Sequence, residues 1–249
     1  MLNPKAISEL QLSVCALGIR RVDAEQHIAE PTAPHFEIIG TGFAVSPELI
    51  VTNRHVLESI KAKLACDTYE HDSFLAQFLT LKPDGWSLHF CKIGDVGSCN
   101  PPDEDVGLLH VPGLVSLGDR AVRFGSPEKL SLGERLAILG YADGSQLLQA
   151  NHGKVFDEEL YRFGPVLQQG YLSATSPVFG CGVVTRLLLD IRTTNGLSGS
   201  PVFKPDTGEV IGIHFASNKT TTAFAVPLDS LRVQTYINNF LHSLNLLQR

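Results

Sequence analysis

The sequence is poor in cysteine and contains no pair or cluster of cysteines that suggests a staple or a metal site. Its five cysteines are Cys15, Cys66, Cys91, Cys99 and Cys181. They are odd in number and widely scattered, and none forms a Cys-x-x-Cys pair, so we expect reduced thiols. The nine histidines show no spacing typical of metal ligands. We therefore predict that the protein uses no metal and no other cofactor.

An excess of positive charge and long hydrophobic runs are also missing. The 249 residues carry 20 Lys and Arg against 26 Asp and Glu, a formal net charge of −6, which gives no electrostatic support for nucleic-acid binding. No stretch reaches the roughly 18 apolar residues of a membrane span. Polar residues interrupt the first twenty positions, unlike a secretory signal. We expect a cytoplasmic protein without a signal peptide or transmembrane segment, whose partners are neither nucleic acids nor membranes.

Short apolar segments with a two-residue alternation dominate the rest of the chain. We predict strands over 36–45 and 49–51 as a hairpin, over 135–140 and 182–188, and over 201–203 and 209–213 around a turn at 205–208. One long helix is predicted over 229–247, from apolar residues at three- and four-residue steps. Many strands, with 22 glycines and 14 prolines, indicate an all-β barrel or sandwich protein.

A serine lies between two glycines in the segment Asn195-Gly196-Leu197-Ser198-Gly199-Ser200-Pro201. Acyl transfer needs a nucleophile on a sharp turn, with backbone amides directed at the developing oxyanion. Gly196 and Gly199 permit such a turn around Ser198, because glycine adopts conformations closed to other residues. The amides of Gly196 and Ser198 would then form the oxyanion hole. Taken alone, the same motif is also compatible with an ordinary tight hairpin.

Two earlier residues are of the types that a serine nucleophile needs. A base must remove the hydroxyl proton, and an acid must fix the tautomer of that base. His55 follows the first predicted hairpin and Asp105 opens an apolar strand, which gives the chain order His55, Asp105, Ser198. Taken singly, His55 could be an ordinary surface or satisfied histidine. Asp105 could be an ordinary acidic residue at the start of a strand. Asp103 and Glu104 are neighbouring candidates, but only Asp105 directly precedes the apolar strand.

Taken together, these segments resemble the signatures of the chymotrypsin-like serine proteases, in the order of that family. They are Gly40-Thr41-Gly42-Phe43 before Val51-Thr52-Asn53-Arg54-His55, then Asp105-Val106-Gly107-Leu108-Leu109, then Gly196-Leu197-Ser198-Gly199-Ser200-Pro201. The resemblance implies an all-β fold of two six-stranded antiparallel β-barrels with a C-terminal helix over 229–247. The first barrel, over 1–118, would carry His55 and Asp105. The second, over 119–249, would carry Ser198 and the specificity pocket.

The resemblance also implies an activity, that of a serine endopeptidase acting on a peptide or protein substrate through an acyl-enzyme. One departure concerns its control. Digestive and clotting members carry an aspartate before the serine, which pairs with a freshly cleaved N-terminus; Leu197 cannot form that ion pair. We therefore expect narrow specificity or a regulatory protein partner. The alternative is a catalytically silent peptide-binding module on the same fold. A serine esterase of the α/β-hydrolase fold is disfavoured, because the Gly-x-Ser-x-Gly elbow is missing.

The details around the serine are similar to those of the glutamyl endopeptidases, in Ser198-Gly199-Ser200-Pro201-Val202-Phe203 and in Gly212-Ile213-His214-Phe215. This likeness implies that His214, Phe215 and Ala216 lie on the strand lining the specificity pocket, and that Thr193 lies at its wall. It predicts cleavage after acidic residues, Glu above Asp, with Gln as the alternative. The competing interpretation is that His214 is simply packed inside the second barrel.

Overall fold

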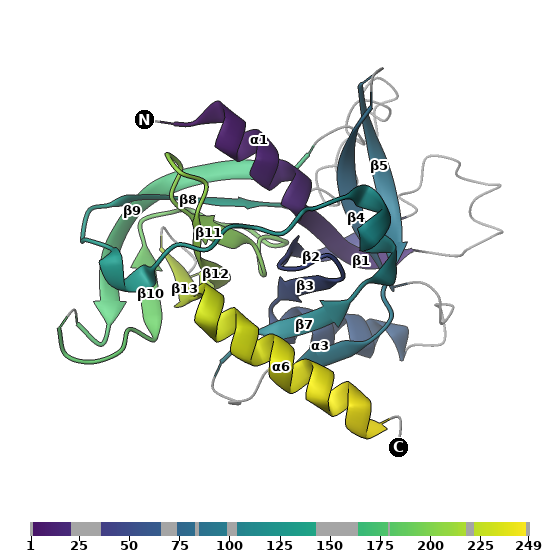
Figure 1. The fold of residues 1–249 in the computed structure, drawn as a ribbon. Coiled ribbons are helices and arrows are strands. Elements are labelled where there is room, and N and C mark those ends of the chain that lie inside the picture. Colours follow the sequence, from purple (N-terminus) through teal and green to yellow (C-terminus); the bar gives the residue numbers. More distant parts are fainter. Residues whose placement is uncertain are drawn as a thin grey trace.

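The structure is a computed structural model that describes residues 2–20, 36–65, 74–82, 85–98, 104–142, 164–178, 180–217 and 222–247. It is mostly β, as expected, and its two β units lie side by side (Figure 1). The N-terminal unit is a sheet in the order β5-β4-β1-β2-β3-β7-β6, and the C-terminal unit is a closed barrel in the order β10-β13-β12-β11-β8-β9. The first unit thus has seven described strands and no described pairing that closes it, where a six-stranded barrel was expected.

The strands of the sheet are β1 (Val14–Arg20), β2 (Phe36–Ala44), β3 (Leu49–Thr52), β4 (Phe74–Lys82), β5 (Gly85–Lys92), β6 (Val96–Ser98) and β7 (Gly107–His110). Those of the barrel are β8 (Arg135–Gly140), β9 (Val166–Ser176), β10 (Arg186–Leu189), β11 (Pro201–Phe203), β12 (Val210–Ser217) and β13 (Ala223–Pro227). The α-helices are α1 (Pro4–Ser13), α3 (Arg54–Leu64) and α6 (Ser230–Leu247), and two 3-10 helices, η1 (Pro112–Leu117) and η2 (Pro127–Lys129), lie between β7 and β8. The domain division at residue 118 stays a prediction.

Most of the predicted strands and the C-terminal helix are confirmed. Strands β2 and β3 pair as a hairpin, β11 and β12 form a second hairpin around residues 205–208, and β8 has the predicted bounds. The strand predicted over 182–188 was wrong in its first half: β10 begins at Arg186. Gly182 has a φ of +128°, which belongs to a turn and not to a strand. Helices α1 and α3 were not predicted.

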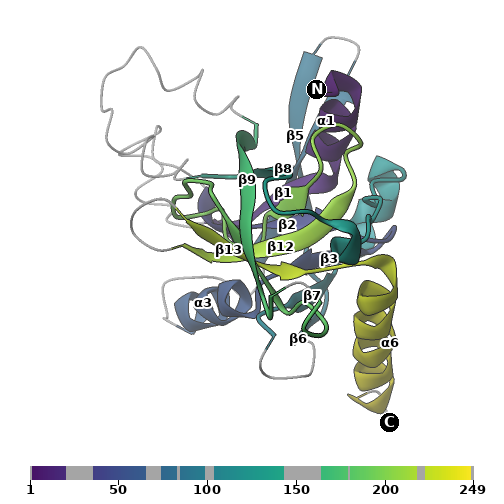
Figure 2. The same cartoon turned by 90° about the vertical axis from the view of Figure 1, so that its left-hand side faces the viewer.

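Three apolar clusters form the core of the two β units and of the interface between them. One fills the N-terminal sheet, one fills the closed barrel, and the largest lies between the two units. The largest cluster combines residues of β2, β8 and α6, among them Phe43, Leu139 and Tyr236, all buried. Helices α1 and α6 lie at opposite sides of the molecule in both views (Figures 1 and 2). No helix among the described residues has the length and apolar character needed to cross a membrane.

Candidate active site

The pairing of β3 with β7 brings His55 and Asp105 together although they are 50 positions apart. Thr52, the last residue of β3, lies opposite Gly107, the first residue of β7, in an antiparallel register. His55 follows the end of the first strand closely, and Asp105 shortly precedes the start of the second. Because adjacent strand ends share one edge of a sheet, the two side chains meet there.

The first turn of α3 makes two hydrogen bonds to the carboxylate of Asp105. The backbone N–H of His55 donates to Oδ1 at 3.0 Å, and its ring Nδ1 donates to Oδ2 at 2.5 Å. Amides in the first turn of a helix lack partners within the helix, and the helix dipole favours a negative charge there. Asn53, the N-cap residue, makes no side-chain capping bond. Asp105 therefore caps α3, and the same contact fixes the rotation of the imidazole ring.

The pKa of Asp105 lies below its ordinary value. Burial is the largest single influence and raises the pKa, but the ring and amide hydrogen bonds from His55 and the charges of His55 and Arg54 together lower it by more. The carboxylate is therefore ionised at neutral pH and accepts the Nδ1 proton of His55. This leaves the lone pair of a neutral imidazole on Nε2, as a general base requires.

Two neighbours hold the backbone of Asp105. Asn53 is fully buried, and its Nδ2 donates to the Asp105 carbonyl at 2.8 Å. The carboxylate of Glu104 accepts hydrogen bonds from Arg232 and Tyr236 of α6. Glu104 was an alternative to Asp105 in the sequence, but its carboxylate binds the C-terminal helix and not the histidine. Asp103, the other candidate considered in place of Asp105, lies outside the described residues.

Ser198 lies in a tight turn before β11; we call residues 195–200 the serine turn. The N–H of Ser200 donates to the Leu197 carbonyl at 3.0 Å. Gly199 has a φ of +88°, and a Cβ there would lie 2.0 Å from the carbonyl oxygen of Thr41, so only glycine fits. Leu197 is fully buried in the core of the barrel. Ser198 therefore lies between Leu197, whose side chain is buried in the barrel core, and Gly199, whose backbone packs closely against Thr41.

The amides of Gly196 and Ser198 have no acceptor in the part of the chain that the structure describes. Among the hydrogen bonds of the described residues neither amide donates, whereas the next amide, that of Gly199, donates to the His214 carbonyl at 2.9 Å. Gly196 has a φ of +86°, a conformation that glycine adopts without strain. Two amides of one turn that are free to donate are the groups that an oxyanion hole requires.

Strand β2 connects the serine turn with the N-terminal sheet. The N–H of Thr41 donates to the Ser198 carbonyl at 2.8 Å, and the hydroxyl of Thr41 donates to the Gly196 carbonyl, also at 2.8 Å. Among the described residues no hydrogen bond joins the Ser198 hydroxyl to the His55 ring. Such bonds often tighten only when substrate binds. No role was predicted for the Thr41 hydroxyl, because its partner, the Gly196 carbonyl, is 155 positions away along the chain.

Strand β12 places His214 beside the serine turn. Its N–H donates to the Ser200 carbonyl at 2.9 Å; the residue is 2% exposed, and Nδ1 donates to the Phe224 carbonyl at 3.1 Å. Burial is the main cause that lowers the pKa of His214 to about 4; the hydrogen bond to Phe224 opposes this shift, and the charge of His55 adds to it. At neutral pH the ring is therefore neutral, with hydrogen on Nδ1 and a lone pair on Nε2.

Three other residues were predicted to line the specificity pocket: Phe215, Ala216 and Thr193. Phe215 follows His214, is half-buried, and has the guanidinium of Arg186 5.2 Å from its ring centroid. Ala216 is half-buried and pairs with β13. The hydroxyl of Thr193 is buried and has no hydrogen-bond partner among the residues that the structure describes. Because a buried hydroxyl without a partner is destabilising, it is suited to receive a ligand group.

Metal-ligating clusters and disulfides are absent from the part of the chain that the structure describes. No group of three or more His, Cys, Asp or Glu in it could hold a metal ion. Its cysteines are free: Cys15 and Cys91 are buried, and Cys181 is exposed. Cys66 and Cys99 lie outside the described residues. Burial raises the pKa of the Cys15 and Cys91 thiols, so neither has the thiolate character of a reactive cysteine.

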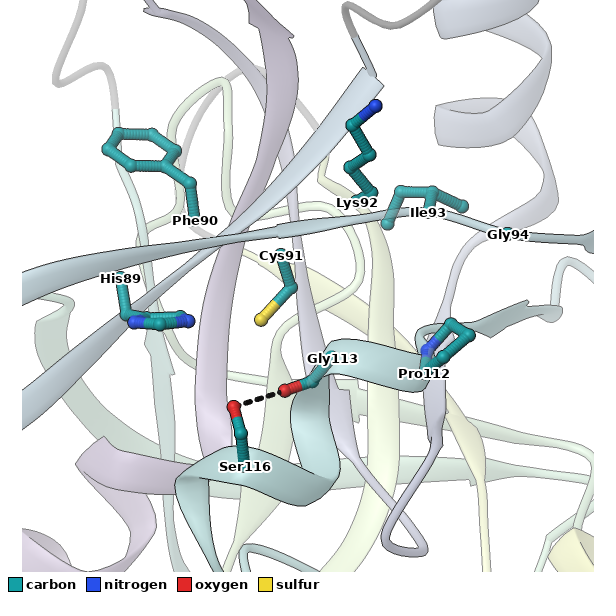
Figure 3. A pocket seen from close by; sticks show the side chains of 9 residues that line it. All are labelled: His89, Phe90, Cys91, Lys92, Ile93, Gly94, Pro112, Gly113 and Ser116. Atoms are coloured by element: carbon teal, nitrogen blue, oxygen red, sulfur yellow. Dashed lines mark hydrogen bonds between the residues drawn. The ribbon is translucent and has the colours of Figure 1, made fainter.

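A cavity of about 440 Å³ lies between β5 and η1, at the edge of the N-terminal sheet. Figure 3 shows the sulfur of Cys91 pointing toward η1, where the Ser116 hydroxyl donates to the Gly113 carbonyl at 2.7 Å. None of the lining residues belongs to the serine turn or to the contact between His55 and Asp105. This cavity is therefore separate from the candidate active site.

Comparison with known proteins places the chain in a family. A family model described as a trypsin-like peptidase domain matches residues 40–213, a span that includes His55, Asp105 and Ser198. No curated protein matches the sequence. The structure of Deg5 is 20% identical over 94% of this chain and 90% of its own, with a TM-score of 0.58. The HtrA-type protease AlgW with a decapeptide is 18% identical over 95% of this chain and 67% of its own, with a TM-score of 0.60. These structures show a shared fold, and the family match covers most of the chain. The chain belongs to the trypsin-like peptidase family.

Proposed function

We propose that the chain is a serine endopeptidase that hydrolyses peptide bonds through an acyl-enzyme. The Ser198 oxygen attacks the carbonyl carbon of the scissile bond, and His55 Nε2 takes the serine proton and gives it to the leaving amine. Water then attacks the ester with His55 again as base, which restores the serine. Asp105 holds the ring in the tautomer with hydrogen on Nδ1. The observation that carries the proposal is the double contact between His55 and Asp105.

The two free amides supply the other half of the mechanism. In the tetrahedral intermediate the carbonyl oxygen becomes an oxyanion, and the amides of Gly196 and Ser198 would donate to it. Loss of one such donor typically lowers kcat by about 10²- to 10³-fold. Since both amides lack internal acceptors among the described residues, no existing hydrogen bond has to break when the oxyanion forms.

Labelling with a fluorophosphonate probe tests the proposal, because the probe phosphonylates only an activated serine. We expect the full chain to be labelled, labelling to vanish in Ser198→Ala, and labelling to become much slower in His55→Ala. Ser116→Ala, at the separate cavity, serves as the control and should label like the wild type. A folded wild-type chain that resists the probe would contradict the proposal and favour the peptide-binding module.

The substrate that we propose is a peptide with an acidic residue before the scissile bond, with Gln as the alternative. The solved structure of the HtrA-type protease AlgW is one with a decapeptide, which supports a peptide as ligand. Thr193 offers a buried hydroxyl that no described residue binds, and the backbone of His214 is hydrogen-bonded to the serine turn. A pocket that takes a carboxylate out of water must replace its hydrogen bonds. The Thr193 hydroxyl can donate one, and His214 can donate a second only when Nε2 carries a proton.

The hydrogen bond from His214 to Phe224 refines this specificity. Because Nδ1 donates to the carbonyl, only Nε2 remains for a substrate, and in the neutral ring this atom accepts. A Gln amide can donate to it directly. A Glu side chain binds well only when a proton lies between the carboxylate and Nε2. Binding of a Glu substrate is therefore coupled to the uptake of a proton, whereas binding of a Gln substrate is not.

A further inference from the structure

Thr41 is the residue through which the N-terminal sheet holds the serine turn. It is fully buried on β2. Its hydroxyl accepts a hydrogen bond from the Tyr141 N–H at 3.0 Å and donates to the Gly196 carbonyl at 2.8 Å. Its N–H donates to the Ser198 carbonyl at 2.8 Å, and its own carbonyl accepts from the Thr52 hydroxyl at 2.7 Å. Every polar group of Thr41 is therefore engaged, and two of them bind the serine turn.

The partners of the Thr41 hydroxyl leave it one orientation. The amide of Tyr141 can only donate and the carbonyl of Gly196 can only accept, so the hydroxyl hydrogen points at Gly196. That carbonyl belongs to the peptide between Gly196 and Leu197, which separates the amides of Gly196 and Ser198. The direction of this one peptide plane consequently decides whether the two amides converge.

Few other contacts restrain the orientation of the Gly196–Leu197 peptide besides the hydrogen bond from the Thr41 hydroxyl. Gly196, with a φ of +86°, belongs to a residue type whose backbone has little intrinsic preference. Leu197 is fully buried and apolar, so its side chain fixes the position of the turn but offers no hydrogen bond. The N–H of Leu197 donates to the Thr194 carbonyl over a long 3.4 Å. The short bond from Thr41 is therefore the strongest polar restraint on the peptide.

We propose that Thr41 is a positioning residue of the active site, whose hydroxyl orients the Gly196–Leu197 peptide so that the amides of Gly196 and Ser198 point at one oxygen atom. The inference rests on the proposed function of Ser198 and adds to it a residue from the other β unit. The hydroxyl is closely packed against β8: a Cβ at Gly140 would lie 1.9 Å from Ser200 Oγ and 2.9 Å from Thr41 Oγ1, so a side chain at this position would displace both residues.

Two substitutions separate the hydroxyl from the volume of the side chain. Thr41→Val removes the hydroxyl and keeps the branched shape, whereas Thr41→Ser keeps the hydroxyl. In Thr41→Val we expect kcat for peptide hydrolysis to fall about 10- to 100-fold with KM within about twofold, since the loss falls on the oxyanion. Thr41→Ser should stay within about threefold of the wild type. Thr80→Val is the matched control, because it removes the hydroxyl of a threonine on β4 that donates to the Ser87 carbonyl of β5.

A second measurement needs no turnover. In the Ser198→Ala background, Thr41→Val should shift the ¹H–¹⁵N resonances of the amides at 196, 197 and 198, and Thr80→Val should not. The proposal is overturned if Thr41→Val keeps its kcat, if Thr41→Ser loses as much as Thr41→Val, or if the loss lies in KM alone. A wild type no more active than Ser198→Ala would refute the proposed function instead. The amide resonances then decide the role of Thr41, and unmoved resonances would overturn it.

Discussion

His55 and Asp105 meet through two atoms each: the ring Nδ1 and the backbone N–H of the histidine donate to the two carboxylate oxygens of the aspartate, at 2.5 and 3.0 Å. One carboxylate therefore sets both the position of the ring and its rotation. The chain also has an exposed counterpart, in which His110 Nδ1 lies 3.2 Å from Asp95 Oδ2. The two pairs offer a matched comparison between a histidine in the proposed active site and one outside it.

Asp105→Asn is expected to lower kcat by roughly 10⁴-fold, because the amide NH₂ would face Nδ1 and force hydrogen onto Nε2, the wrong tautomer for a base. The fold should persist, since the amide oxygen can still accept from the His55 N–H. Asp95→Asn should leave peptide hydrolysis within about twofold of the wild type. The measurement is kcat of both variants on one peptide substrate. Similar losses of kcat in the two variants would show that the contact between Asp105 and His55 has no particular role in catalysis.

The Glu104 carboxylate couples α6 to the backbone beside Asp105. Glu104→Ala leaves Arg232 and the Tyr236 hydroxyl without their acceptor, so we expect the free energy of unfolding to fall by about 1–3 kcal/mol. Glu9→Ala, which breaks an exposed pair with Lys5, should change it by less than about 0.5 kcal/mol. Urea unfolding of both variants tests this. Equal stability of Glu104→Ala and wild type would mean that the contact with α6 contributes nothing.

His214 is expected to make the protein acid-sensitive. Its pKa is lowered from an ordinary 6.5 to about 4, so the unfolded chain binds a proton in this window and the folded protein does not. Stability is therefore retained above pH 6.5 and lost as the pH falls toward 4, by on the order of 3 kcal/mol. Denaturant unfolding at pH 7 and pH 4 should show a larger loss for the wild type than for His214→Gln. Parallel losses would contradict a buried neutral ring.

The specificity for Glu against Gln should depend on pH. Because the Glu complex takes up one proton and the Gln complex none, the ratio of kcat/KM for Glu over Gln substrates should rise by up to about tenfold per unit as the pH falls from 8 to 5. Using the ratio cancels every effect of pH that the two substrates share. Paired peptides that differ only at this residue provide the measurement. A ratio that stays constant would remove His214 from the recognition of the side chain.

The local signals of the fold could be read from the sequence. The turn at 205–208 and the apolar steps of the C-terminal helix are properties of neighbouring residues, and both were confirmed. Helix α1 also had a local signal that was overlooked: Asn3 accepts from the Ala6 N–H at 3.3 Å, and Pro4 occupies the first helical position. The boundary error at β10 arose because Gly182 was placed within an apolar strand.

The supporting residues of the site could not be read in the same way. His55, Asp105 and Ser198 could be proposed from their types and order, but the contacts of Thr41 and Glu104 depend on partners 155 and more than 100 positions away. No local pattern distinguishes a threonine that binds a distant turn from one that fills a strand. The bond from His214 to Phe224 likewise appears only when β12 and β13 pair, and it decides which ring nitrogen remains for a substrate.

The central claim, that Ser198 is the nucleophile, is tested most directly by peptide hydrolysis in Ser198→Ala. Only binding and the oxyanion amides would remain, so we expect kcat/KM to fall by roughly 10³-fold or more while far-UV circular dichroism is unchanged. The double variant with His55→Ala should be little worse, because the two residues act as one unit. Activity of Ser198→Ala within about tenfold of the wild type would contradict the account.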